Sequence, residues 1–289
     1  LVGATQSSHK GYGTSLEWRK SLVYDKPRFM DLTVHTSHWG GLERLPGHQN
    51  VATGTGFDQL LDGGAELRYK NQRSSIGASD AELGHQWWLG ASVNGVRQTH
   101  AGGSAWNGFP FVDGGLDMGR PIPGFRNSSL WLRTAAGFAT RNDPDEPFAN
   151  FYFGGFGNSG LDVGEPRRYR DSRQFPGAGI DAIAATRYAR GMLDWNLPAL
   201  RFRRAGTLAL YASWARLSLF GSGLATNFSE AGSSRGAADR RKLANAGAQV
   251  DVRMQLLTQS PLTLSLGWAY ALERHFAPTR EWMASLKVL

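Results

Sequence analysis

The sequence has no cysteine among its 289 residues, so disulfide bonds and thiolate metal sites are excluded. It also lacks any run of about 18 apolar residues, and a transmembrane helix is therefore not expected. A membrane-spanning β-barrel stays open, because such a barrel carries its apolar surface on every second residue and is hydrophilic on average.

Glycine and positive charge are abundant instead. The chain has 37 glycines, 10 tryptophans and a formal net charge of +8. A basic chain often binds nucleic acid. Here the arginines are scattered along the chain, so we expect no nucleic-acid partner. Lipid phosphates or a basic channel interior are equally good partners for this charge.

Period-two alternation predicts β-strands along most of the chain. In 244–257, for example, Val250 and Val252 alternate with Gln249, Asp251 and Arg253. The predicted strands are 11–23, 28–39, 64–70, 84–97, 106–118, 127–139, 186–197, 205–220, 244–257, 261–273 and 280–289. No helical segment of comparable strength is present, so an all-β fold is expected.

The joints between these strands alternate between short and long, as in Tyr24–Pro27 and Thr140–Ala185. This alternation, on strands of about ten residues, is typical of an antiparallel outer-membrane barrel. A soluble β-sandwich or propeller would also use short alternating strands. Strand length and the charged residues on one face favour the barrel, and no propeller repeat of about 40–45 residues is found.

The segment Phe151–Gly177 has no periodicity, yet it is rich in aromatic residues. Disordered segments are poor in aromatics, and long loops in folded domains are usually functional. We therefore expect an ordered loop that folds back onto the strands. Its glycines do not form a phosphate-binding loop, because no helix pattern follows them.

This loop and the strands after it resemble the C-terminal barrel of the bacterial surface-antigen superfamily, which includes BamA-like insertases and two-partner secretion transporters. Phe153-Gly154-Gly155 is similar to the family's aromatic–Gly-Gly segment. Arg168-Tyr169-Arg170, followed by Phe175-Pro176-Gly177, is similar to its Arg-Gly-aromatic tip, with the glycine replaced. The resemblance implies that 140–185 folds into the barrel lumen.

The family barrel has sixteen strands, whereas this chain supplies about eleven. The resemblance therefore implies a C-terminal portion of a barrel. The remaining strands, and any periplasmic domain, would lie upstream, or the strands would come from another chain. It also implies insertion or translocation of polypeptides, or of lipid, at the bacterial outer membrane. A passive anion-preferring pore, or a membrane anchor for partner proteins, is the alternative.

Within a lumen, Arg168 would need a carboxylate partner, because an unpaired buried charge is costly. Asp194 and Asp251 are the candidate loop-locking acids, since alternation turns both toward the interior. Arg68, Arg190 and Arg253 are expected to make the lumen basic, which would favour anions.

No spacing selects a catalytic nucleophile or a metal site, so we expect no enzyme activity, metal or cofactor. Basic residues near strand ends, such as Arg28, Arg126 and Arg141, would contact lipopolysaccharide phosphates or be ordinary solvated loop residues. The expected partners are outer-membrane lipid, including lipopolysaccharide, and partner proteins or a substrate polypeptide.

Overall fold

A computed structural model describes residues 11–41, 57–100, 103–141, 146–157, 161–162, 167–207, 209–228, 240–257, 260–273 and 277–288. Over these residues the protein is all-β and antiparallel, which confirms the predicted class, and no α-helix occurs among them. No helix in the described part of the chain is long and apolar enough to cross a membrane.

The eleven long strands of the main sheet follow one another in sequence order, and each pairs with the next by antiparallel hydrogen bonds, whereas the two residues of β8 pair with β15 in parallel. Its eleven long strands are β1 (Tyr12–Asp25), β2 (Arg28–Gly40), β3 (Phe57–Arg73), β4 (Leu83–His100), β5 (Gly103–Pro121), β6 (Ser129–Ala139), β10 (Arg187–Asn196), β12 (Leu210–Thr226), β13 (Lys242–Leu256), β14 (Ser260–Glu273) and β15 (Thr279–Val288). Each corresponds to one predicted segment. The short β11 (Leu200–Gly206) pairs with β12, so the prediction of one strand over 205–220 was wrong at its start, where Gly206 turns the chain at positive φ.

The connection between β6 and β10 carries all the remaining short elements. These are the 3₁₀ turns η1 (Pro147–Ala149) and η2 (Arg168–Arg170) and the strands β7 (Phe151–Phe153), β8 (Leu161–Asp162) and β9 (Ile183–Ala185). We call residues 146–185 the inner loop. Its residues 158–160 and 163–166, and residues 142–145 before it, belong to the predicted loop 140–185 but lie outside the described residues.

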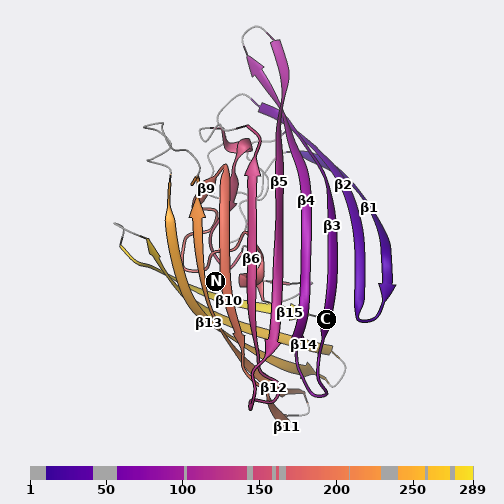
Figure 1. The fold of residues 1–289 in the computed structure, drawn as a ribbon, viewed down its shortest axis with the longest axis vertical. Coiled ribbons are helices and arrows are strands. Elements are labelled where there is room, and N and C mark those ends of the chain that lie inside the picture. The colour runs from indigo at the N-terminus through magenta and orange to yellow at the C-terminus, as the bar shows by residue number, and fades with distance from the viewer. Residues whose placement is uncertain are drawn as a thin grey trace.

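The sheet is strongly curved, and the inner loop lies on its concave side (Figure 1). Strands β3 to β6 and β10 lie nearest the viewer, and β13, β14 and β15 pass behind the loop. We call the eleven long strands of the main sheet the wall. The sheet does not close within the described residues. There, β1 pairs only with β2, and β15 pairs with β14 and with the two residues of β8.

Alternation along each strand separates two chemically different faces. In β10, Tyr188, Asp194 and Asn196 point to the concave side and are buried, whereas Leu193 and Trp195 are exposed on the convex side. In β13, Asn245, Gln249 and Asp251 are likewise buried on the concave side. The convex side exposes large apolar residues on every strand from β4 to β6, as in Leu89, Leu116 and Leu132. The concave side also buries aromatic residues such as Phe111 and Phe220. Buried charged residues on this side and exposed apolar residues on the convex side nevertheless depart from the usual pattern of a water-soluble domain.

Candidate functional site

Aromatic residues fasten the inner loop to the concave face. Phe151 packs edge-to-face on Phe111 of β5 and Tyr188 of β10, with ring centroids 5.1 and 4.9 Å apart. Phe153 packs on the same Tyr188 at 4.7 Å, and both phenylalanines are fully buried. Burying an aromatic side chain contributes about 1.5–3 kcal/mol, so these contacts hold the loop firmly to the wall.

Glycines let the loop backbone approach itself and the wall closely. Gly154 and Gly177 have φ values of 145° and 97°, which side chains disfavour. A Cβ on Gly154 would lie 1.9 Å from the carbonyl oxygen of Gly179, and one on Gly177 would lie 2.6 Å from the backbone nitrogen of Ala271. Gly155, also at positive φ, forms an isolated β-bridge with Phe175.

The Phe175-Pro176-Gly177 segment is tied by hydrogen bonds to two strands, β13 and β15. The Asn245 side chain of β13 donates to the carbonyl of Pro176 at 2.8 Å, and Thr279 of β15 donates to the carbonyl of Gly177 at 2.5 Å. The carboxylate of Glu281, on β15, accepts the backbone N–H groups of Gly177 at 2.9 Å and of Phe156 at 3.0 Å. Glu281 thus joins the two glycine-rich parts of the loop to the last strand.

The tip of the inner loop, η2, inserts Tyr169 into the wall. Its ring stacks on Phe220 of β12 at 4.3 Å and an angle of 11°, and its hydroxyl donates to Asp194 at 3.0 Å. Burial, and to a smaller extent the charge of Asp194, raise the pKa of Tyr169 to about 12. The hydroxyl therefore remains a donor at any physiological pH.

Two arginines beside Tyr169 reach carboxylates from three parts of the chain. Arg170 lies 2.9 Å from both Asp194 and Asp80. Arg167 forms an ion pair with Asp80 and lies 3.7 Å from Asp251. Both also donate to the Asn196 side chain, at 3.2 Å from Arg167 and 2.8 Å from Arg170.

Wall residues complete a cluster of opposite charges. Arg133 of β6 lies 2.7 Å from Asp117 and 3.1 Å from Asp194, and Arg216 of β12 lies 2.7 Å from Asp251. We call the four arginines and four aspartates the charge cluster: Arg133, Arg167, Arg170, Arg216, Asp80, Asp117, Asp194 and Asp251. Because the charges balance, each buried ion has the partner that its desolvation requires.

Asp80 is the one member that comes from a short joint, residues 74–82 between β3 and β4. This joint reaches across to β12, where the Ser79 hydroxyl accepts a hydrogen bond from Arg216 at 3.0 Å. Burial opposes ionisation of Asp80, but Arg170, Arg167 and Arg216 outweigh it and hold its pKa well below the usual value. Asp80 is therefore a permanent anion under the loop tip.

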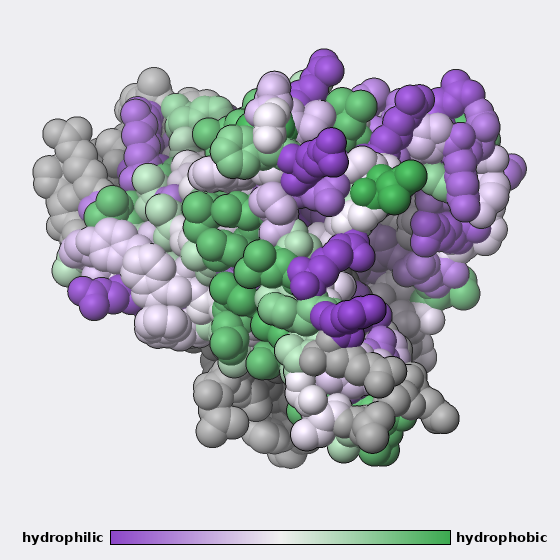
Figure 2. Space-filling model, turned by 90° about the horizontal axis from the view of Figure 1, so that it is seen from below, coloured by the Kyte–Doolittle hydropathy of each residue, from purple (hydrophilic) through white to green (hydrophobic). Residues whose placement is uncertain are grey.

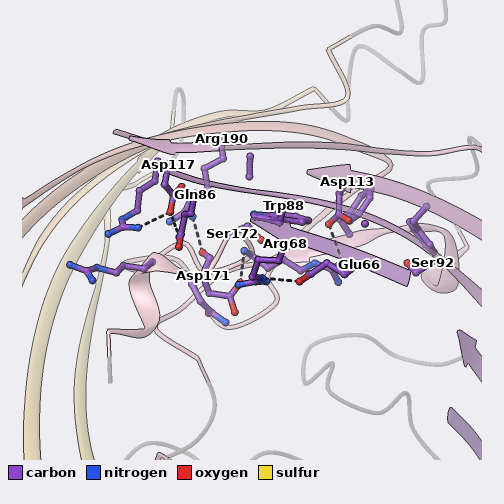
Figure 3. Close-up of a pocket in the computed structure, with 18 of the residues that line it drawn as sticks. Glu66, Arg68, Gln86, Trp88, Ser92, Asp113, Asp117, Asp171, Ser172 and Arg190 are labelled. Carbon is purple, nitrogen blue, oxygen red and sulfur yellow. Dashed lines mark hydrogen bonds and ion pairs between the residues drawn. The ribbon is translucent and has the colours of Figure 1, made fainter. Parts of the chain in front are cut away.

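A cavity of about 1130 Å³ lies between the inner loop and strands β2 to β6 (Figure 3). Its charged lining residues are largely paired: Arg68 with Glu66 at 2.8 Å, and Arg173 with Asp113 at 3.5 Å. Arg190 donates to the backbone carbonyl of Asp171 at 2.7 Å. The cavity can hold water and small polar solutes, and both signs of charge line it.

The structure thus brings most of the sequence-predicted residues together. Phe153, Gly154, Gly155, Tyr169, Arg170, Phe175, Pro176 and Gly177 all lie in the inner loop against the wall, and Asp194 and Asp251 lie in the charge cluster. Arg168, Arg68 and Arg190 line the cavity. Arg253, which lies farther along β13, does not line the cavity. It donates a hydrogen bond to Thr263 of β14 at 3.4 Å.

The sequence did not predict Asp80 or Glu281 as site residues. Asp80 resembles an ordinary polar turn residue, and no local pattern distinguishes it. Glu281 had a usable signal, because alternation in β15 places it on the same face as Met283 and Ser285, which are buried. Within the described residues, no three His, Asp or Glu side chains are grouped so that they could hold a metal ion.

No protein-family model matches the chain, and a search of curated proteins found no significant match. The function therefore has to be argued from the geometry.

Proposed function

We propose that this chain forms part of the wall of an outer-membrane β-barrel resembling the BamA-like proteins. In this proposal it acts in the insertion or translocation of polypeptides, or of lipid, at the outer membrane. The observation that carries the proposal is the reversed polarity of the sheet, with a balanced charge cluster on the concave side and apolar residues on the convex side. A bilayer provides the apolar solvent that such a convex face needs.

Among the described residues, the outer edge of β1 has no partner strand and that of β15 pairs only with the two residues of β8, and both edges support a larger barrel. A bilayer does not tolerate open sheet edges, because each unpaired N–H or C=O group there costs several kcal/mol. We therefore propose that further strands, from the same polypeptide or from another chain, complete the barrel toward sixteen. A seam beside β15, whose edge contacts only β8 among the described residues, would be the place where the wall opens.

The inner loop would act as an internal brace in this mechanism. It contacts β5 and β10 through Phe151, β12 through Tyr169 and β13 through Pro176. It contacts β15 through the backbone N–H groups of Phe156 and Gly177, which donate to Glu281. It therefore holds the curved wall in one shape while the seam opens. Insertion would be driven by pairing of substrate strands with the edge strands at the seam, and not by a chemical reaction.

A reconstitution experiment tests this function. The chain, together with whatever strands complete its barrel, is placed in phospholipid vesicles, and an unfolded outer-membrane protein is added. The proposal predicts that the added protein folds into the vesicles faster than into empty ones. Equal folding rates, with the barrel inserted, would reject the insertion function.

The alternative is a passive anion-preferring pore or a membrane anchor, which the basic residues Arg68, Arg168 and Arg190 around the cavity favour. Planar-bilayer conductance separates the two functions. A braced barrel with the loop inside gives small, flickering currents. A pore gives steady anion currents that fall when Arg68 is replaced by glutamine.

A further inference from the structure

A pair of arginines stands on the convex face at the end of the wall where the short joints lie. Arg73 is the last residue of β3, and Arg120 is the next-to-last residue of β5. Lys70 and Gln72 line the cavity on the concave side, so alternation turns Arg73 outward. Asp117 lines the cavity in the same way, and Arg120, three residues later, also points outward.

The two arginines lie on either side of β4. Arg73 pairs with Leu83, and the last β4–β5 pair is Gly84 with Gly119, so Leu83 and Arg120 occupy the next positions toward the joints. The strands of a sheet lie about 4.8 Å apart, so the two backbones are about 10 Å apart. Arginine side chains are long enough to converge on one group over that distance.

The surroundings of this pair combine positive charge with apolar surface. Neither guanidinium makes a hydrogen bond or an ion pair within the described part of the chain, and both arginines are exposed. The carboxylates of the neighbouring joint are turned away, since Asp80 lies in the charge cluster and Glu82 accepts from Ser75 at 2.9 Å. No described carboxylate of this joint competes for the two arginines.

An aromatic stack lies farther from the joints on the same face. Tyr69 stacks on Trp87 with ring centroids 5.8 Å apart, and the tilted ring of His85 lies 5.7 Å from Tyr69. Leu83 and Met118, both exposed, fill the space between this stack and the arginines. Figure 2, which views the molecule from the short-joint end, shows strongly hydrophilic residues directly beside a strip of hydrophobic ones.

We propose that Arg73 and Arg120 together bind the phosphate of an anionic phospholipid, whose acyl chains lie along Leu83, Met118 and the Tyr69–Trp87 stack. Guanidinium groups bind phosphate through charge-assisted hydrogen bonds. Aromatic rings with a polar atom favour the headgroup level of a bilayer. A lipid fits better than a protein surface, because the apolar residues continue the membrane-facing side of the wall. The site rests on the proposed membrane location, and it adds a particular lipid class and the residues that select it.

Native mass spectrometry of the full chain in a neutral detergent tests the site, with phosphatidylglycerol and phosphatidylcholine as probes. The wild type is expected to hold one phosphatidylglycerol molecule more tightly than phosphatidylcholine. The double variant Arg73→Gln/Arg120→Gln should weaken that first molecule about tenfold or more, since each lost charge-assisted bond is worth roughly one decade of affinity.

Arg280 provides a matched control. It is an exposed arginine at the opposite end of the wall, next to the outward pair Trp268 and Trp282, whose centroids are 6.2 Å apart. Arg280→Gln should leave the first phosphatidylglycerol molecule in place. An equal loss in this variant, or equal binding of the two lipids by the wild type, would overturn the proposal and leave only general attraction between charges.

Different results would reject the membrane location and the arginine site. If the chain stays monodisperse without detergent and does not enter vesicles, the membrane location itself is wrong. If it enters vesicles but shows no preference for phosphatidylglycerol, only the arginine site is wrong. Circular dichroism of the double variant checks that its β-sheet is intact. If the double variant does not fold, lipid binding is measured on the single variants Arg73→Gln and Arg120→Gln, each of which should weaken the first phosphatidylglycerol molecule.

Discussion

Asp80 and Arg167 form an ion pair under the tip of the inner loop, although 87 residues separate them in the sequence. Asp80 belongs to a short joint, and Arg167 belongs to the connection that enters from the opposite end of the wall. Two segments that enter from opposite ends of the sheet thus meet at one pair of charges. Loss of this ion pair should loosen both the short joint and the tip of the inner loop.

Replacing Asp80 with asparagine should therefore destabilise the protein. The change leaves Arg167 and Arg170 near one fewer carboxylate, and breaking a buried ion pair typically costs about 3–5 kcal/mol. Asp80 is 23% exposed, so we expect a smaller loss of about 2 kcal/mol. Thermal unfolding in detergent measures it. Asp25→Asn is the matched control, because the Asp25–Arg28 pair is more than half exposed and solvent screens it, so its loss should leave the melting temperature nearly unchanged.

Stability should also depend on pH through Asp80. Its pKa is lower in the folded protein than the usual value of 3.8, so its ionised form stabilises the fold above that pH. The contribution is lost as the pH falls below about 3.8 toward the folded pKa. The difference in melting temperature between the wild type and Asp80→Asn should be constant near neutral pH and shrink below pH 4. A difference that does not change down to pH 3 would contradict the ion pair.

Tyr169→Phe should separate the hydroxyl of Tyr169 from its ring. The phenylalanine keeps the stack on Phe220 but loses the hydrogen bond to Asp194, which costs about 1–2 kcal/mol. Tyr169→Ala removes the ring as well and should cost about 3–5 kcal/mol. Denaturant unfolding of the two variants gives both values. If Phe and Ala cost the same, the tip is not packed as described.

Gly177→Ala should detach the end of the inner loop from β14. The new Cβ would meet the Ala271 backbone at 2.6 Å, and φ at Gly177 is positive, so both the space and the backbone oppose the change. Gly191→Ala is the control, because nothing lies within 4 Å of that position. Limited proteolysis should cut the inner loop faster in Gly177→Ala only. Equal protection in both variants would show that Gly177 does not anchor the loop.

The sequence predicted the strands well because each strand carries its own signal. Alternation in β10 and β13 identified Asp194 and Asp251 as inward residues without any knowledge of their neighbours. The partners of these residues were not predictable in this way. Which arginine meets which aspartate depends on the strand order and on the curvature of the sheet. The contact from Glu281 to Phe156, for example, joins residues 125 positions apart.

The inner loop was predictable as ordered but not in its detailed contacts. Its aromatic residues indicated a packed segment, and Phe151, Phe153 and Phe175 are fully buried. The sequence drew attention to Arg168, whereas Arg167, which had no separate signal, reaches both Asp80 and Asp251. The sequence around this 3₁₀ turn does not show which arginine meets which carboxylate, because the partners come from distant strands and joints.

The most direct test of the whole account is the structure of the intact particle in a lipid nanodisc by cryo-electron microscopy. The account predicts a closed barrel in which further strands pair with β1 and β15, the convex face contacts lipid, and residues 146–185 lie inside. A particle whose convex face is covered by protein or exposed to water, with the inner loop outside any lumen, would contradict it.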